Sequence, residues 1–285
     1  RPITFFEELI NIKGDLWIGN IGSELSTAIL DACEPKGENF NPVRQYNAPY
    51  GFFRRNAPSA PHNSLRHDPD GQLMKCCMLS RLVHPTSLGY RYATRININP
   101  SGKRQLIPSM YGDQHVFVSD QSQNWLIPSD MPQLRQLLES YDQRSKRVKS
   151  GLWYHETAYR NYYMDIRWPL LVTGLEALLH VPGEMNTRQP RRHAGSTRVF
   201  VSRMLAVGDA CPDAAISESD LFSIYDLRSG LAHGQALGSL PPDRKRLYEM
   251  TEKALSAVLY KAITDASFGG IFESDVSVQV DLPLT

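Results

Sequence analysis

The stretch SESDLFSIYDLRSGLAHG, residues 217–234, constrains the fold most, because its apolar residues recur at helical spacing. Steps of three, three and four residues place them on one side of a helix, at Leu221, Ile224, Leu227 and Leu231. The Ser217 hydroxyl can accept hydrogen bonds from the first backbone N–H groups, and Gly234 suits a left-handed cap at the end. The stretch therefore predicts a core-facing amphipathic helix.

Several other segments show the same period and are joined by short polar connections. Asp130, Met131 and Pro132 suit the first turn of a helix, and an apolar face follows at Leu134, Leu137, Leu138 and Tyr141. Residues 166–179 are apolar on most sides, and helical segments are also expected at 152–163, at 199–208 and after Pro241-Pro242. We therefore expect an antiparallel helical bundle over residues 129–285, with a core that includes Leu171, Leu175, Leu178 and the stripe of residues 217–234.

The part ahead of this bundle has a different pattern. Alternating residues at 90–96 predict a strand, 105–107 and 116–118 suggest further short strands, and residues 73–82 suit a helix or a strand. Repeated prolines at 34–71 disfavour regular structure there. A chain of 285 residues is long enough for two domains. We expect an α+β protein with a mixed, loop-rich N-terminal domain at residues 1–128.

Composition excludes several classes of protein. The formal charge of +1 argues against a uniformly basic nucleic-acid-coating protein. The four cysteines include no C-x-x-C pair, so neither a zinc site nor a disulfide framework is expected. The most apolar run, 168–181, is interrupted by Glu176 and is too short to cross a bilayer. A reducing cytoplasm is the expected compartment, with no membrane, metal or organic cofactor.

Two residues in the stretch 217–234, Arg228 and His233, are not required by a core. Five residues apart, their side chains would point roughly 140° away from each other on an unbroken helix. Either His233 lies on or beyond the last turn, or a second chain completes a shared site. A plain alternative is a capping histidine and a surface arginine. Glu176 either faces solvent or needs a partner such as Arg228.

The segment Arg228-Ser-Gly-Leu-Ala-His233 resembles the R-x4-6-H motif of HEPN domains. Its context, IYDLRSGLAHG, resembles the Apea-like branch of that superfamily, and residues 164–181 are similar to the preceding helix of those proteins. The resemblance covers roughly residues 130–265. It implies a dimerising helical bundle and, in active members, a metal-independent endoribonuclease. Arg228 and His233 are then the expected catalytic residues, with Ser229, Glu176 and Asp226 in support.

The same resemblance leaves a second function open. Many active members carry Asn, Asp or His directly after the motif arginine, where this chain has Ser229. A catalytically silent HEPN-like module for dimerisation and for protein or nucleotide binding is therefore the alternative. The expected partners are RNA, a second copy of the chain and a protein trigger or inhibitor, in a defence or toxin setting. RNA phosphates could be contacted by a cluster of arginines, at Arg188, Arg191, Arg192 and Arg198, unless these belong to a plain solvated connection.

Overall fold

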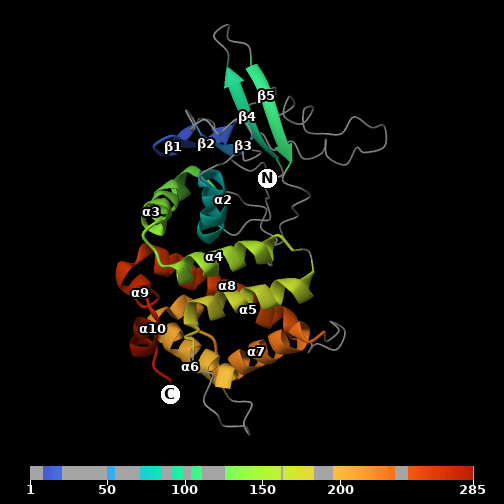
Figure 1. Ribbon diagram of the computed structural model, residues 1–285, viewed down its shortest axis with the longest axis vertical. Helices are drawn as coiled ribbons and strands as arrows, with labels where there is room; N and C mark the ends of the chain where they lie inside the picture. Colours follow the sequence, from blue (N-terminus) through green and yellow to red (C-terminus); the bar gives the residue numbers. More distant parts are fainter. Residues whose placement is uncertain are drawn as a thin grey trace. The chain divides into compact units, whose positions relative to one another are not determined.

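In the computed structural model of the chain, the described residues are 9–20, 50–54, 71–84, 92–98, 104–110, 126–161, 163–182, 195–234 and 243–284. They are mostly helical and include a small antiparallel sheet, as expected for an α+β protein (Figure 1). They divide into two compact units, one up to Leu138 and one from Glu139. The division falls within helix α3 (Met131–Tyr141), which follows the short 3-10 helix η2 (Pro128–Asp130).

The first unit contains two separate antiparallel sheets and helix α2 (Gln72–Val83). The larger sheet has the order β1 (Ile10–Lys13), β2 (Leu16–Asn20), β3 (Tyr50–Arg54). The predicted strands near 90–96 and 105–107 are confirmed as β4 (Tyr92–Ile98) and β5 (Arg104–Met110). The strand predicted at 116–118 lies outside the described residues.

Between β1 and β2 the chain turns at Gly14 and Asp15, residue types that suit a turn. Residues 10–13 form a strand, and Gly14 occupies the turn with a φ of 54°, a left-handed conformation that glycine adopts easily. The β1–β2 register shifts between Asn11 and Lys13. This irregularity breaks the period-2 alternation by which a strand is recognised in a sequence.

The second unit consists of helices. Its long members are α4 (Lys146–Tyr159), α5 (Met164–Leu179), α6 (Gly195–Ala210), α7 (Glu218–Ala232) and α8 (Arg244–Thr264). In Figure 1, α5 lies between α4 on one side and α6 and α7 on the other, and α8 packs against α4 and α5. α4 and α5 are antiparallel and approach closely at glycines, since a Cβ on Gly151 would lie 3.3 Å from the Gly174 carbonyl oxygen.

The predicted core of this unit is confirmed. Each of the seven residues is at most 8% exposed, namely Leu171, Leu175, Leu178, Leu221, Ile224, Leu227 and Leu231. α5 runs through Pro169 without ending, and α4 ends before it at Tyr159. Among the parts of the chain that the structure describes, no helix combines the length and apolar character that crossing a membrane requires.

A group of basic residues follows α3 but does not belong to it. By charge they suit the last turns of that helix, but α3 ends at Tyr141, ahead of Arg144, Lys146, Arg147 and Lys149. Ser145 begins a new helix, with its hydroxyl accepting from the Val148 N–H at 3.3 Å. Arg147 donates to the carbonyls of Leu178 and His180 at the end of α5. A cation is favourable there because a helix C-terminus carries partial negative charge.

The C-terminal segment is helical although its valines alternate. Val276, Val278 and Val280 have the spacing of a strand, but the chain forms helices α9 (Ala266–Gly270) and α10 (Asp275–Asp281). Ser274 caps α10 by accepting from the Ser277 N–H at 3.0 Å. Val278 and Leu282, one helical turn apart, are buried, and this pair outweighs the alternating pattern.

Candidate functional site

Helix α7 positions the site. Ser217 accepts from the Asp220 N–H at 3.2 Å and caps its start, and His233 with Gly234, at a φ of 85°, closes its end. The helix forms where the sequence predicts it because cap, apolar stripe and terminal glycine agree locally. With the stripe buried, Arg228 lies on the flank of the helix, and its side chain is 28% exposed.

Glu176 of α5 is the partner of Arg228. The Arg228 Nη2 donates to Glu176 Oε2 at 2.7 Å, and the glutamate side chain is 20% exposed. The structure thus confirms the pairing that the sequence suggested for the carboxylate within the apolar run. A charge-assisted bond of this length holds the guanidinium in one direction while leaving part of it open to solvent.

Tyr225 is a third member, which the sequence reasoning missed. Its hydroxyl donates to the other oxygen of Glu176, Oε1, at 3.1 Å. Its ring lies 5.1 Å from that of Phe200 in α6 and 5.7 Å from the Arg228 Cζ. A tyrosine three residues before the motif arginine shares its face of the helix, and this spacing was the available signal. We call Tyr225, Glu176 and Arg228 the site triad.

The electrostatics of the site triad keep the tyrosine as a donor. Burial raises the pKa of the Tyr225 hydroxyl, and the negative charge of Glu176 adds to this rise, whereas Ser196 and Arg228 oppose it. The hydroxyl therefore keeps its proton at neutral pH and points it at the carboxylate. The Nε of Arg228 is buried and has no hydrogen-bond partner among the described residues.

The structure does not bring His233 to Arg228. His233 is exposed at the end of α7, where its backbone N–H donates to the carbonyls of Ser229 and Gly230, both at 3.1 Å. Within the described residues, its imidazole makes no hydrogen bond or ion pair. Of the supporting residues, Ser229 is half-buried and Asp226 is exposed, and neither joins the arginine to the histidine. One chain therefore presents a positioned cation and a separate, solvent-facing imidazole.

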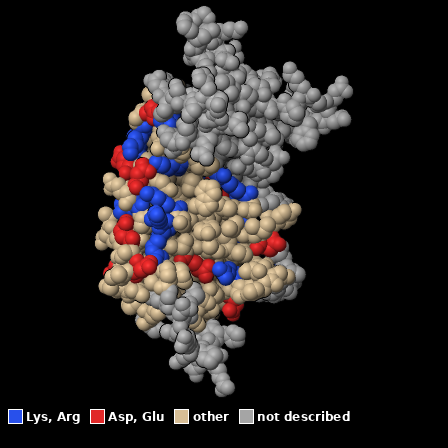
Figure 2. All heavy atoms as spheres, viewed as in Figure 1, with Lys and Arg blue, Asp and Glu red and all other residues tan. Residues whose placement is uncertain are grey.

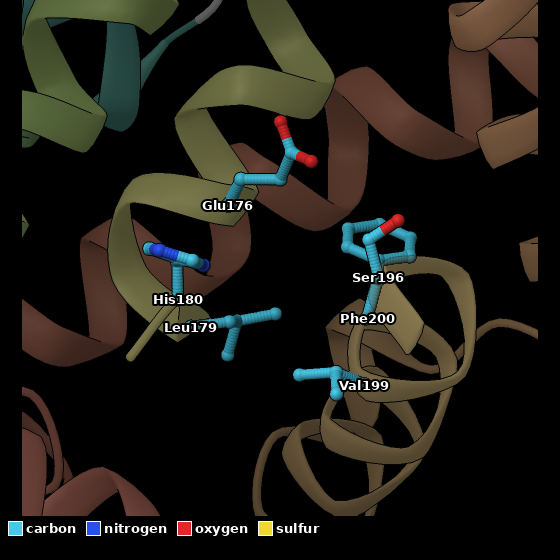
Figure 3. Close-up of a pocket in the computed structure, with 6 residues that line it drawn as sticks. All are labelled: Glu176, Leu179, His180, Ser196, Val199 and Phe200. Atoms are coloured by element: carbon cyan, nitrogen blue, oxygen red, sulfur yellow. The ribbon is translucent and has the colours of Figure 1, made fainter. Parts of the chain in front are cut away.

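A small hollow adjoins the site triad. It lies between the end of α5 and the first turns of α6 and is lined by Glu176, Leu179, His180, Ser196, Val199 and Phe200 (Figure 3). Glu176 thus belongs to both the hollow and the ion pair.

The predicted arginine cluster is described only in part. Arg198 is exposed on α6, and Arg188, Arg191 and Arg192 lie outside the described residues. On the face in Figure 2, basic and acidic side chains lie next to one another over the described surface. That face has no uniformly basic track, so any phosphate contact there depends on individual arginines.

The site has neither a metal-binding cluster nor a counterpart among known proteins to identify it, as far as the described residues extend. Within the parts of the chain that the structure describes, no group of three or more His, Cys, Asp or Glu residues is placed to hold a metal ion. Comparison of the chain with known protein families, with curated proteins and with solved structures found no match.

Proposed function

We propose that the helical unit is a HEPN-like module and a metal-independent endoribonuclease whose site is completed by a second copy of the chain. The observation that supports this most is that one helix, α7, carries both an arginine oriented by the site triad and an exposed histidine at its end. Arg228 is oriented by Glu176 and partly open to solvent, and His233 is free to face another molecule. The R-x4-H spacing of these two residues is the motif by which the chain resembles HEPN domains.

The proposed chemistry uses the 2′-hydroxyl of the RNA as the nucleophile. It requires a base near that oxygen, a cation at the phosphate and an acid at the leaving oxygen. A histidine can exchange protons near neutral pH, and an arginine binds phosphate through two N–H groups while keeping its charge. Arg228 is the proposed phosphate clamp and His233 the proposed proton-transfer residue.

A dimer supplies what one chain lacks. Five residues apart on one helix, Arg228 and His233 lie roughly 140° from each other around its axis, so one copy offers a clamp without an adjacent base. A two-fold axis through the ends of two α7 helices would bring two arginines and two histidines into one cleft. Arg198 on the neighbouring helix, with Arg188, Arg191 and Arg192, is the proposed contact for the RNA backbone.

The silent module is kept as a second candidate because one observation favours it. The charge of Arg228 is already neutralised by Glu176 at 2.7 Å. An arginine whose only role is to hold α7 against α5 would make the same contact with Glu176. In that case the unit binds a protein or a nucleotide and dimerises without cleaving RNA, and Ser229 carries no catalytic constraint.

Cleavage of an RNA pool separates the two functions. We expect the chain to cut RNA in EDTA, to leave cyclic phosphate ends and to spare DNA, which lacks the 2′-hydroxyl. His233→Ala should lower the rate by about 10² to 10⁴, the usual loss for a positioned acid or base. Arg228→Lys keeps the charge but loses the planar fork, so its cleavage should also be severely impaired.

The controls make this result interpretable. Arg246→Lys is the matched variant, because Arg246 also donates to a carboxylate at 2.7 Å, that of Asp220, away from the site triad. It should cleave as wild type does, and circular dichroism should show that every variant is folded. If wild type cleaves no RNA, or if His233→Ala cleaves equally well, the silent module is the better assignment.

The dimer is tested by complementation. Sedimentation should show a dimer at micromolar concentration. A chain carrying Arg228→Ala mixed with a chain carrying His233→Ala should differ in cleavage rate from either variant alone, because the mixed dimer holds one arginine and one histidine from different copies. A strict monomer, or a mixture no different from its components, removes the composite site.

A further inference from the structure

The two oxygens of Glu176 are divided between two donors. Tyr225 donates to Oε1 at 3.1 Å, and Arg228 donates to Oε2 at 2.7 Å. Both donors come from α7, one turn apart, and the acceptor comes from α5. The tyrosine is held in place from the other side by Phe200 of α6, at 5.1 Å between ring centroids, and is only 6% exposed.

This division leaves the ion pair incomplete. In a guanidinium, Nε and Nη2 lie on the same edge, and a carboxylate that binds this edge with both oxygens makes the strongest arginine pair. Here Nη2 is bonded, but the adjacent Nε is buried and has no hydrogen-bond partner among the described residues. The oxygen that would satisfy it is Oε1, which accepts from Tyr225.

We propose that Tyr225 is a positioning residue that limits Arg228 to a hydrogen bond with one oxygen of Glu176, so that the guanidinium stays available to an RNA phosphate. The hydroxyl holds Oε1 away from Arg228. The carboxylate therefore orients the arginine through Oε2 alone and does not bind it with both oxygens. The phosphate as ligand rests on the proposed function; the effect of Tyr225 on the pair does not. Without the hydroxyl, Glu176 rotates to accept from both Nε and Nη2 and competes with phosphate for the cation.

A second Tyr–Glu–Arg group in the same unit provides the matched control. Tyr248 donates to Glu252 Oε1 at 3.3 Å, and Arg167 Nη2 lies 3.6 Å from that same oxygen. We call these three residues the core triad. This triad contains neither Glu176 nor Arg228, so Tyr248→Phe removes the same chemical group without changing which oxygens face Arg228.

The experiment measures binding of an uncleavable probe, a short fluorescein-labelled RNA oligonucleotide with 2′-O-methyl groups. Tyr225→Phe should raise its Kd about tenfold, the effect of one charge-assisted hydrogen bond. Adding Glu176→Gln to Tyr225→Phe should restore binding, because a neutral amide holds the arginine less strongly. Tyr248→Phe should leave the Kd unchanged.

A structural role for Tyr225 gives a different pattern. If the tyrosine only packs helices together, the Glu176→Gln change will not rescue binding and the losses will add. That result, or an unchanged Kd in Tyr225→Phe, overturns the proposal.

A second measurement is independent of RNA. NMR of the arginine Nε–H groups should show the Arg228 proton exchanging with water more slowly in Tyr225→Phe than in wild type, because it gains Glu176 as a partner. If wild type does not bind the probe but this slowing is seen, the proposed function fails and the effect of Tyr225 on the ion pair stands. Unchanged exchange overturns the positioning role, whatever the RNA result.

Discussion

The site triad and the core triad are built from the same three residue types but lie in different surroundings. In each, a tyrosine donates to a glutamate and an arginine lies over the tyrosine ring, at 5.7 Å in the site triad and 5.0 Å in the core triad. The arginine and glutamate side chains are 28% and 20% exposed in the site triad, but 9% and 11% exposed in the core triad.

This difference in solvent exposure means that the two ion pairs should affect different properties of the protein. Charges removed from water need opposite charges beside them, so breaking the core triad takes an opposite charge away from a buried group. Charges at the rim can turn to water or to a ligand, so breaking the site triad has a small effect on folding. We therefore expect the core triad to act on stability and the site triad on binding.

The largest expected effect is the loss of protein stability when the core triad is broken. Glu252→Ala should lower the free energy of unfolding by about 3–5 kcal/mol, because it removes a carboxylate 3.6 Å from the buried guanidinium of Arg167. Glu176→Ala should lower it by about 1 kcal/mol or less, because water reaches Arg228. Urea denaturation followed by circular dichroism measures both, and equal losses would contradict the distinction between the triads.

A double replacement should recover much of that loss. Arg167→Met combined with Glu252→Leu removes both buried charges and should regain about 2 kcal/mol relative to Glu252→Ala alone, because apolar side chains of similar size replace a desolvated pair. The same urea titration applies. No recovery would show that packing around Glu252, rather than charge, accounts for the single-variant loss.

Removing the two tyrosine hydroxyls should change the free energy of unfolding by smaller and unequal amounts. Tyr248→Phe should cost about 1.5 kcal/mol of unfolding free energy, because it leaves a buried carboxylate with one donor fewer. Tyr225→Phe should cost about 0.5 kcal/mol, since Glu176 can form a second bond with Arg228 or bind water. Thermal denaturation of the two variants gives the comparison, and the reverse order would contradict it.

The smallest effect is expected at a third, more exposed pair. Arg246 donates to both oxygens of Asp220, at 3.1 and 2.7 Å, and this lowers the pKa of the Asp220 carboxyl below its usual value. A carboxyl whose pKa is lower in the folded protein than in the unfolded chain stabilises the fold at pH values above the unfolded-state pKa. This stabilisation is lost as the pH falls through the folded-state pKa. Asp220→Asn should therefore cost about 0.5 kcal/mol at neutral pH.

The pH dependence of that cost is the control. The difference between wild type and Asp220→Asn should stay constant from neutral pH to about pH 5 and disappear well below about pH 4, where the carboxyl is protonated even when paired. Denaturation at a series of pH values measures it. A difference that persists unchanged at low pH would show that the side-chain shape, not the charge, matters.

Much of the site helix was predictable because its signals are local. The Ser217 cap, the leucine stripe and Gly234 all lie within one short segment, and each is confirmed. Glu176 was recognisable as a carboxylate in an apolar run, and pairing with Arg228 was one of two alternatives, the other being exposure to solvent. Tyr225 was missed because a helical tyrosine suits a core and a surface equally well.

In two other segments, the sequence contains patterns that favour different secondary structures. Lys146 and Arg147 fit the end of one helix by charge, but the Ser145 cap makes them the start of the next, where Arg147 neutralises the end of a different helix. The valines at the C-terminal end fit a strand by alternation, and burial of Val278 and Leu282 selects a helix instead.

The sequence by itself determined the helical period, the caps and the types of residue at the site, since each depends on neighbours within a few positions. The tertiary structure alone decided which Glu176 oxygen each donor takes, that the Arg228 Nε stays without a partner among the described residues, and that the second Tyr–Glu–Arg group is buried. These features arise where α5 meets α7 and where α5 meets α8, across 49 residues for Tyr225 and Glu176. Hydrogen-bond direction and burial depend on how helices distant in the sequence pack together, and no local pattern encodes that geometry.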